Sequence, residues 1–365
     1  MTDVMPICFY LPQFHPVPFN DMHWGHGFSE WTNVARGRPL FAGHEQPRLP
    51  GELGFYDLRY RPILAEQIAL AQTYGVYGFC FYYYRFGEQR ELHLPVRQLL
   101  SRSKPNLPFC LCWANENWTR AWDGRSDELI RNQDYSETTL TGVIDDLSEA
   151  MQDPRYIRVN GKPVFLIYQI DLVPRPVGEW TQALRERLRV RCGAECLLGA
   201  VFSPGMTRQY ADFVDFVVEF PPHRIPREGQ RLLLDIQSVQ PFDLERKDYF
   251  EAYDSVVASS LAGLDWIGKL VPGVCPDWDN SCRRPKGAHV LIGSNPEKFS
   301  RWVSLAANIA LDKAEKKEIP YPFLFVNAWN EWGEGAALEP SWTSQRRYLE
   351  AFKTGLGLSV RPKIS

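Results

Sequence analysis

Eight short apolar runs recur along the chain, and they constrain its fold more than any other feature of the sequence. Most are apolar nearly throughout rather than alternating with polar residues, which is typical of strands buried on both faces of a parallel sheet. The runs cover residues 5–11, 76–84, 108–113, 163–168, 196–202, 215–220, 269–274 and 322–329. We therefore expect a mainly parallel sheet covered by helices.

Helical stretches separate most of these runs. Residues 57–75 have Pro62 in their first turn, apolar positions near helical spacing and Gly75 as a stop signal. Residues 294–314 begin with a Ser-Asn pair that can cap a helix, followed by proline, and their apolar residues fall on one helical face. Both segments are predicted to be helices.

The alternation of helices with eight strands favours a (β/α)8 TIM barrel, an α/β fold, over a doubly wound sheet. The segments after the first, third, sixth and seventh strands are long, with residues 12–57 the longest. In a barrel, segments that follow strands lie on the C-terminal face, where active sites are built. We expect one barrel domain over residues 1–365 with long loops on that face, and a type I′ hairpin at Asn160-Gly161 before the fourth strand.

Composition narrows the class of protein. Hydrophobic residues make up 44% and charged residues 23% of the 365 residues, so a large core is possible. The net charge of −3, without a long basic run, argues against a nucleic-acid or anionic-membrane partner. Residues 1–14 lack a signal-peptide pattern, and no stretch approaches ~18 uninterrupted apolar residues. We expect a cytoplasmic protein without an integral membrane segment, and its oligomeric state stays open.

Sequence markers of common cofactors are absent. The chain has no phosphate-binding or dinucleotide-binding glycine motif, no zinc-protease motif and no serine-hydrolase elbow. Four histidines of the first long loop lack the spacing of metal ligands. Asp277 and Asp279 resemble the short acidic pair that holds a metal and a nucleotide-sugar in many glycosyltransferases, but a polar loop at a strand end accounts for them as simply. We expect neither a metal nor a cofactor.

The stretch "NAWNEWGEGAALEP", residues 327–340, follows the last apolar run and places Glu331 and Glu334 three positions apart. Both glutamates should lie at the C-terminal end of the last strand or in the loop after it, where barrel catalytic groups sit. An acidic N-terminal cap for the last helix is the alternative. It accounts poorly for Trp329 and Trp332 beside the glutamates, so we predict that Glu331 and Glu334 are catalytic.

Two further segments, residues 24–34 and 112–124, place tryptophans beside Asn, Glu and Asp side chains. Sugar rings offer C–H surfaces for stacking and hydroxyls for hydrogen bonds, so such segments suit a carbohydrate. A protein-protein surface can also be rich in tryptophan, but the amide and carboxylate content favours a polyhydroxylated ligand. We therefore expect an oligosaccharide or polysaccharide substrate.

Many segments together resemble one known family. They are "FYLPQFHP", "GFSEWTNV", "PGELGFYDLR", "YGVYGFCFYYYRF", "CWANENWTRAWDG", "NGKPVFLIY", "PDWDNSCR" and "NAWNEWGEGAALEP", which run from residue 8 to 340. The chain resembles the WbsX family, which is called glycoside hydrolase family ninety-nine-like and is often described as glycosyltransferases of polysaccharide biosynthesis. The related endo-α-mannosidases are similar in having a (β/α)8 barrel and an E-W-x-E pair, which matches Glu331 and Glu334.

This resemblance implies a retaining hydrolysis through a 1,2-anhydro sugar. Glu331 would deprotonate the 2-hydroxyl of the substrate, which attacks C1, while Glu334 protonates the leaving oxygen and later activates water. Such an attack needs O1 and O2 trans, as in α-mannosides and α-L-rhamnosides. The substrate would be α-linked mannose- or rhamnose-type residues of a surface polysaccharide or its precursor.

Three alternatives stay open. In an ordinary double displacement, Glu116 would be the acid/base and Glu331 the nucleophile, with carboxyl groups about 5 Å apart. A glycosyltransferase of O-antigen or other surface polysaccharide biosynthesis would act on the same sugars. A non-catalytic sugar-binding module is the third class, although binding alone needs no E-W-x-E pair.

We expect the aromatic and polar residues near the glutamate pair to bind the sugar. They are Trp24, Glu30, Trp31, Asn33, Tyr82, Trp113, Asn115, Glu116, Trp118, Trp122, Asp123, Glu219, Trp278, Asp279, Trp329 and Asn330. The chain departs from the family pattern at Gly333, Ala337 and Ser341, and at Arg85, where tryptophan is usual. Arg85 predicts an anionic or modified sugar.

Overall fold

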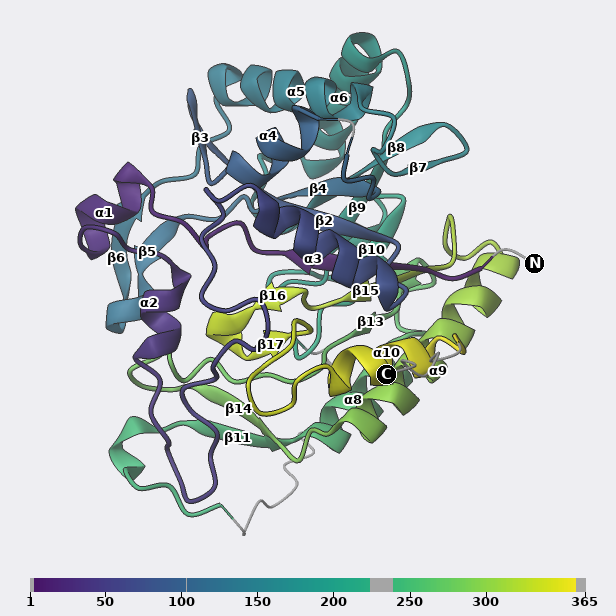
Figure 1. Cartoon of the computed structure of the whole chain (residues 1–365). Coiled ribbons are helices and arrows are strands. Elements are labelled where there is room, and N and C mark those ends of the chain that lie inside the picture. The colour runs from purple at the N-terminus through teal and green to yellow at the C-terminus, as the bar shows by residue number, and fades with distance from the viewer. Residues whose placement is uncertain (1–2, 103, 224–238, 359–365) are drawn as a thin grey trace.

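The computed structural model describes residues 3–102, 104–223 and 239–358, and Figure 1 shows their arrangement. Eight positions around a central barrel are filled by parallel strands. The barrel strands are β1 (Met5–Tyr10), β2 (Gly78–Phe86), β4 (Phe109–Trp113), β8 (Lys162–Ile167), β9 (Leu197–Val201), β10 (Phe216–Val218), β12 (Leu270–Val271), β13 (Gly273–Val274) and β15 (Phe323–Val326). The predicted (β/α)8 barrel is confirmed.

The seventh predicted strand, residues 269–274, is divided at Pro272 into β12 and β13. Proline has no N–H to donate to a ladder, so it interrupts the strand. β12 pairs with β10 and β13 pairs with β15, so the two halves together close the barrel. Each of the eight apolar runs thus contributes to the barrel wall.

Helices surround the barrel and follow the strands in order (Figure 1). They are α1 (Pro18–Trp24), α2 (Glu30–Ala35), α3 (Pro62–Thr73), α4 (Leu94–Leu100), α5 (Glu137–Gln152), α6 (Val177–Cys192), α7 (Arg208–Ala211), α8 (Tyr253–Gly263), α9 (Pro296–Glu315) and α10 (Arg347–Gly355). The two helices expected from the sequence are α3 and α9. Pro62 begins α3, and Asn295 caps α9 by accepting a hydrogen bond from the Lys298 N–H at 2.9 Å.

Small β-elements decorate the barrel. They are β3 (Gln89–Glu91), β5 (Trp118–Arg120), β6 (Arg125–Arg131), β7 (Arg158–Val159), β11 (Tyr249–Ala252), β14 (His289–Ile292), β16 (Asn330–Glu331) and β17 (Ala336–Ala337), with the 3-10 turns η1 (Ala121–Asp123), η2 (Ile170–Leu172), η3 (Leu244–Arg246) and η4 (Trp332–Glu334). The predicted hairpin at Asn160-Gly161 joins β7 to β8, and both turn residues have positive φ, as a type I′ turn requires.

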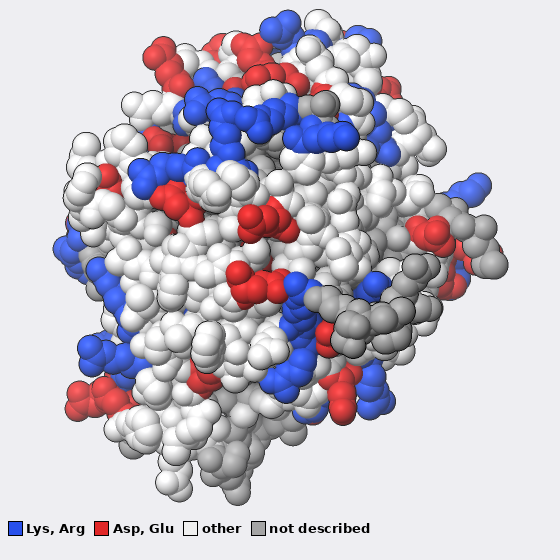
Figure 2. Space-filling view, in the orientation of Figure 1, with Lys and Arg blue, Asp and Glu red and all other residues white. Residues whose placement is uncertain are grey.

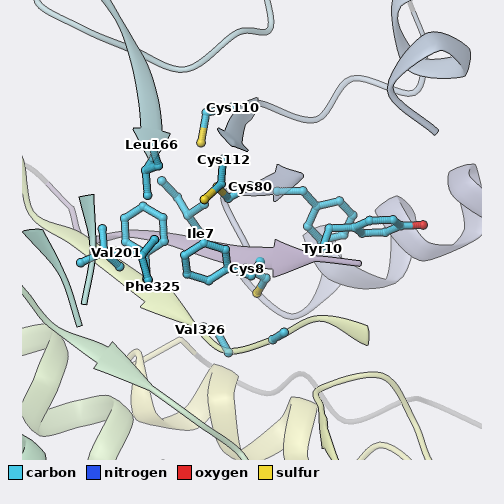
Figure 3. Packing of buried hydrophobic residues seen from close by; sticks show 14 of the residues in the cluster. Ile7, Cys8, Tyr10, Cys80, Cys110, Cys112, Leu166, Val201, Phe325 and Val326 are labelled. Atoms are coloured by element: carbon cyan, nitrogen blue, oxygen red, sulfur yellow. The ribbon is translucent and has the colours of Figure 1, made fainter. Parts of the chain in front are cut away.

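Burial on both faces explains why the strands read as continuous apolar runs. In β1, the Phe9 ring packs inside the barrel against Tyr82, Phe220 and Phe325. The next residue, Tyr10, points to the helix layer and donates a hydrogen bond from its hydroxyl to Gln67 of α3 at 2.7 Å. Figure 3 shows side chains of β1, β2, β4, β8, β9 and β15 meeting in this core, including buried free thiols.

In Figure 1 the barrel strands run from right to left, so their C-terminal ends lie on the left. The loops after β1, β4 and β13 gather there with α1, α2 and the β5–β6 hairpin. Figure 2 shows Lys and Arg side chains in a band over α4, with Asp and Glu interspersed elsewhere on the same face. Among the described residues, no helix is long and apolar enough to cross a membrane.

Candidate active site

A cavity of ≈ 350 Å³ opens among the loops at the C-terminal ends of the strands. It is lined by the glutamates of the E-W-x-E motif, by further polar residues and by aromatic rings. Among its lining residues are Glu331, Glu334, Glu116, Arg283, Arg284, Gln13, Asn117, Trp24, Trp118, Trp122, Tyr82, Tyr84, Tyr168 and Phe220. We call this cavity the cleft.

The glutamate pair is fixed to the end of the neighbouring strand β1. The Asn330 amide accepts a hydrogen bond from the Leu11 N–H at 2.8 Å and donates one to the Leu11 carbonyl at 3.0 Å. The Trp329 N–H donates to the Phe9 carbonyl at 2.8 Å. These bonds place Glu331 in β16 and Glu334 in η4, far from the start of α10, so the helix-cap interpretation does not hold.

Arg283 joins the two glutamates. Its Nη2 lies 2.5 Å from Glu331 Oε1, its Nη1 lies 3.1 Å from Glu334 Oε1, and its Nε lies 2.7 Å from Glu30 Oε1. Three carboxyl groups therefore meet one guanidinium. Arg283 is 12% exposed and Glu30 is fully buried, whereas Glu334 is 25% exposed at the cleft.

Burial dominates the electrostatics of the pair. Burial raises the pKa of Glu331 to about 8; the Arg283 charge acts against this rise, and the neighbouring Glu334 and Glu30 add to it. Burial raises the pKa of Glu334 as well, with Arg283 again opposing it. Each carboxyl raises the pKa of the other or shares Arg283 with it, so the two titrate as a pair and not independently.

Glu116, in the loop after β4, brings a third carboxyl to the cleft. Its carboxyl accepts a hydrogen bond from the Gln169 side-chain amide. Burial raises the pKa of Glu116 to about 7, partly offset by Gln169 and reinforced by Glu334. A carboxyl with this pKa can give a proton at neutral pH.

Aromatic rings form one wall of the cleft. Trp24 and Trp122 lie 4.9 Å apart between ring centroids, and Trp118 packs on Tyr84 at 5.5 Å. These rings come from the end of α1, the β5–β6 hairpin and β2. Wide ring faces beside carboxylates provide the mixture of stacking surface and hydrogen-bond acceptors that sugar rings fit.

Seven residues expected at the sugar line the cleft: Glu331, Glu334, Glu116, Trp24, Trp118, Trp122 and Tyr82. The others that are described lie behind or beside it. They are Glu30, Trp31, Asn33, Trp113, Asn115, Glu219, Trp278, Asp279, Trp329 and Asn330, and all of them are buried. The side chain of Asp123 lies outside the described part of the structure.

These buried residues build the cleft without lining it. Trp31 donates its indole N–H to the Tyr56 carbonyl at 2.7 Å, and Asn115 bonds the backbone of Gln169. Glu219 accepts from the Gly273 N–H at 3.1 Å. In loops, hydrogen bonds to distant segments decide which polar side chain turns inward, and a single sequence does not reveal them.

Arg85 also lies away from the cleft. Its guanidinium is 2.7 Å from Asp146 of α5 and donates to the Gly87 carbonyl. The arginine is thus engaged on the outside of the barrel, and the expectation that it contacts an anionic sugar is corrected. The cleft arginines are Arg283 and Arg284, which the sequence placed in "PDWDNSCR" and the residue after it without assigning them a role.

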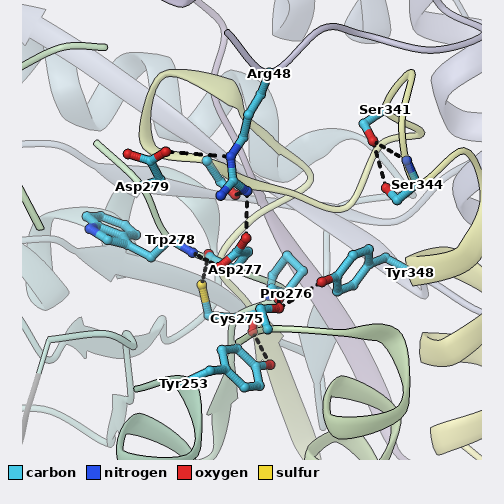
Figure 4. Close-up of polar contacts among 12 residues, drawn as sticks. Arg48, Tyr253, Cys275, Pro276, Asp277, Trp278, Asp279, Ser341, Ser344 and Tyr348 are labelled. Atoms are coloured by element: carbon cyan, nitrogen blue, oxygen red, sulfur yellow. Dashed lines mark hydrogen bonds and ion pairs between the residues drawn. The ribbon is translucent and has the colours of Figure 1, made fainter. Parts of the chain in front are cut away.

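Asp277 and Asp279 hold an arginine, as Figure 4 shows. Arg48 Nη1 lies 2.7 Å from Asp277, and Arg48 Nε lies 3.8 Å from Asp279. Asp279 is fully buried and also contacts His44 at 2.8 Å and Gln46 at 2.5 Å. Although burial alone would raise it, the hydrogen bond with His44 and the Arg48 charge hold the pKa of Asp279 well below its usual value.

We expect Asp279→Ala to lower the free energy of unfolding by about 3–5 kcal/mol, because it leaves the buried partners of a carboxylate without their counterpart. Urea unfolding with and without a chelator measures the effect. Asp254→Ala, which removes an exposed ion pair with Lys298, is the control and should change stability by less than about 1 kcal/mol. If a divalent metal stabilised the wild-type protein but not Asp279→Ala, the result would support a metal site at Asp277 and Asp279.

Comparison with known proteins identifies the family of the chain. The model of the family described as Glycosyltransferase WbsX matches residues 6–352. The uncharacterized protein WxcX, from two strains of Xanthomonas campestris pv. campestris, is 38% identical over 355 and 356 residues, which is 96% of this chain and 49% of each relative. The chain thus spans about half the length of the curated relatives it matches.

Solved structures share the fold at low sequence identity. A glycoside hydrolase-like protein superposes with a TM-score of 0.63 at 14% identity over 98% of this chain and 95% of the other. An endo-α-mannosidase of glycoside hydrolase family 99 from Bacteroides thetaiotaomicron has a TM-score of 0.58 at 15% identity, with 98% of both chains covered. Because the family model matches residues 6–352, the chain belongs to the family described as Glycosyltransferase WbsX.

Proposed function

We propose that this protein is a retaining glycoside hydrolase, that residues 1–365 form its catalytic domain, and that it acts on α-linked mannose- or rhamnose-type residues of a surface polysaccharide or its precursor. One observation carries the proposal: Glu331 and Glu334 meet at Arg283 in a cleft walled by tryptophan rings. Two interacting glutamates in one cleft supply the base and the acid that the reaction needs.

The chemistry runs through the substrate's own 2-hydroxyl. Glu331 takes the proton of this hydroxyl while O2 attacks C1, the bond from C1 to the leaving oxygen breaks, and Glu334 protonates that oxygen. Glu334 then takes a proton from water, the water oxygen attacks C1, the C1–O2 bond breaks, and Glu331 returns its proton to O2. The pair holds one proton throughout, so neither step requires two charged carboxylates side by side.

Arg283 donates a hydrogen bond to Oε1 of Glu331 and forms an ion pair with Oε1 of Glu334. The Oε2 atoms have no hydrogen bond from a described residue, which leaves them for the 2-hydroxyl and the leaving oxygen. Tryptophan rings at the cleft wall would stack on the sugars to either side. The ordinary double displacement with Glu116 as acid/base also stays in view, because Glu116 lines the same cleft.

A panel of α-mannosyl and α-rhamnosyl oligosaccharides tests the proposal, with products separated by chromatography. We expect wild type to release new reducing ends and Glu334→Gln to release at least about 100-fold less. Gly268→Ala, at a surface turn with no atom near the added methyl group, is the control.

A glycosyltransferase is the second candidate, and the description of the family favours it. Nucleotide-sugar with acceptor glycans, run beside the panel, tests it. A longer acceptor with released nucleotide, and no hydrolysis of any oligosaccharide, would replace the hydrolase by the transferase. Ligand binding without turnover of any substrate, unchanged in Glu334→Gln, would indicate a sugar-binding module.

A further inference from the structure

Arg283 is engaged on its far side by Glu30, which no sugar in the cleft can reach. Glu30 is fully buried at the start of α2. Its carboxylate accepts hydrogen bonds from Arg283 Nε at 2.7 Å, from Gln13 Nε2 at 3.2 Å and from Asn33 Nδ2 at 3.3 and 3.4 Å. This many donors suits an ionised carboxylate. Glu30 thus neutralises Arg283 and fixes its direction.

Gly333, the third residue of the E-W-x-E motif, leaves the space that this ion pair occupies. A Cβ built on Gly333 would overlap Glu30 Oε1 and Arg283 Nε and would lie 2.9 Å from Arg283 Cζ. The Gly333 carbonyl in addition accepts from the Cys282 thiol at 3.2 Å. The main chain between the two glutamates therefore has no room for a side chain if Arg283 is to reach both of them.

Backbone hydrogen bonds of the loop after β13 fix the position of Arg283. The Asp279 N–H donates to the Glu334 carbonyl at 2.6 Å, and the Arg283 N–H donates to the Asn280 carbonyl at 3.1 Å. The loop that carries the arginine is therefore bonded to the turn that carries Glu334. The guanidinium also lies 5.9 Å from the Trp122 ring at the cleft wall.

From this geometry we propose that Arg283 is a positioning residue for the Glu331 and Glu334 pair, that Glu30 positions Arg283 in turn, and that Gly333 is the residue which makes their approach possible. The inference rests on the proposed function of the pair. In this arrangement Arg283 orients both carboxyl groups by binding one oxygen of each. It also supplies the positive charge that lets one of them stay ionised in a buried site.

Other charged and titratable groups face the pair, and the test must separate them from Arg283. From β2 they are Tyr82 and Tyr84, after β8 Tyr168, after β4 Glu116, and after β13 Arg284. Variants at Glu30 and Gly333 leave all five in place.

The test measures the carboxyl pKa values of Glu331 and Glu334 directly, by carbon-13 NMR of side-chain-labelled glutamate in the folded protein. Signals are assigned by their loss in Glu331→Gln and Glu334→Gln. We expect Gly333→Ala to raise both pKa values by about one unit, because the added methyl group displaces the guanidinium. Glu30→Gln should lower them by a similar amount, because it removes a negative charge beside the pair and keeps a hydrogen-bond acceptor for Arg283.

Gly268→Ala is the matched control for the added methyl group, and its pKa values should equal those of wild type. Arg283→Met should raise both pKa values further; if the unpaired Glu30 prevents this variant from folding, the double variant Glu30→Gln with Arg283→Met removes both buried charges. Folded Gly333→Ala and Glu30→Gln proteins with wild-type pKa values would overturn the inference and leave Arg283 a purely structural residue.

The pH dependence of kcat/KM on an active oligosaccharide gives the second readout. In each variant, the pH values at which kcat/KM rises and falls should shift in the same direction as the carboxyl pKa values measured by NMR. Because the NMR titration needs no substrate, it tests the inference even when no oligosaccharide is cleaved. Shifted pKa values with no hydrolysis would support the role of Arg283 and count against the proposed function, whereas hydrolysis with unshifted pKa values would do the reverse.

Discussion

Glu334→Gln is expected to lower kcat/KM on an oligosaccharide by about 10²- to 10⁴-fold, the usual contribution of a general acid. The loss should be much smaller on a 4-nitrophenyl glycoside, because that leaving group departs without protonation. Glu331→Gln should be impaired on both substrates, because the attack by the 2-hydroxyl needs its base whatever the leaving group. Steady-state kinetics of the two variants on the two substrates measure this difference.

Glu116→Gln separates the two mechanisms. If the glutamate pair acts through the 2-hydroxyl, Glu116→Gln should lose activity about equally on both substrates, as expected when a substrate contact is weakened. The double displacement predicts a different result. In that case Glu116→Gln would lose activity on the oligosaccharide but keep nearly all of it on the 4-nitrophenyl glycoside, and Glu334→Gln would not show this difference between the substrates. Glu116 would then be the acid. Asp254→Asn, in an exposed ion pair with Lys298 and not among the residues that line the cleft, serves as the control for both substrates.

The free energy of unfolding is expected to fall by several kcal/mol as the pH rises from about 5 to 8. Burial raises the pKa of Glu116, Glu219 and Glu339 from 4.5 to about 7, and that of Glu331 to about 8. Each carboxyl binds its proton more tightly in the folded chain than in the unfolded one. Between the unfolded and folded pKa values, the unfolded chain binds fewer protons than the folded one, so stability falls as the pH increases.

Urea unfolding at a series of pH values measures this slope. Glu219 provides a sharp control, since it is buried outside the cleft and bonded to the Gly273 N–H. Glu219→Gln should make the slope shallower and leave the cleft unchanged. A stability that is constant or rises over this pH range would contradict the burial of these four carboxyls as ionisable groups.

The fold could be predicted because its signals are local. Strands buried on both faces, such as β1 with Phe9 inside and Tyr10 against α3, leave continuous apolar runs, and the α3 and α9 helices carry Pro62 and Asn295 at their starts. The position of Glu331 and Glu334 followed from the rule that barrel sites form at strand ends. The division of the seventh strand at Pro272 also has a local cause, the missing N–H of proline, but the continuous apolar run predicts a single strand there.

The composition of the site could be predicted only in part, because burial in loops depends on distant partners. Glu30 and Glu116 both stand beside tryptophans in the sequence, yet Glu30 points to Arg283 and Glu116 to the cleft. Asp279 is fixed by His44 and Arg48, more than 200 positions away along the chain. The sequence around Arg283 does not indicate its role, apart from its place between two acidic motifs. Its three carboxyl partners, Glu30, Glu331 and Glu334, come from two other segments of the chain.

The most direct measurement is a proton NMR time course of wild-type protein with the best oligosaccharide of the panel. The account predicts that the new reducing end first appears as the α-anomer and only later equilibrates with the β-anomer, and that Glu334→Gln gives no signal on the same time scale. A β-anomer that appears first would establish inversion and would contradict both the 1,2-anhydro route and the double displacement.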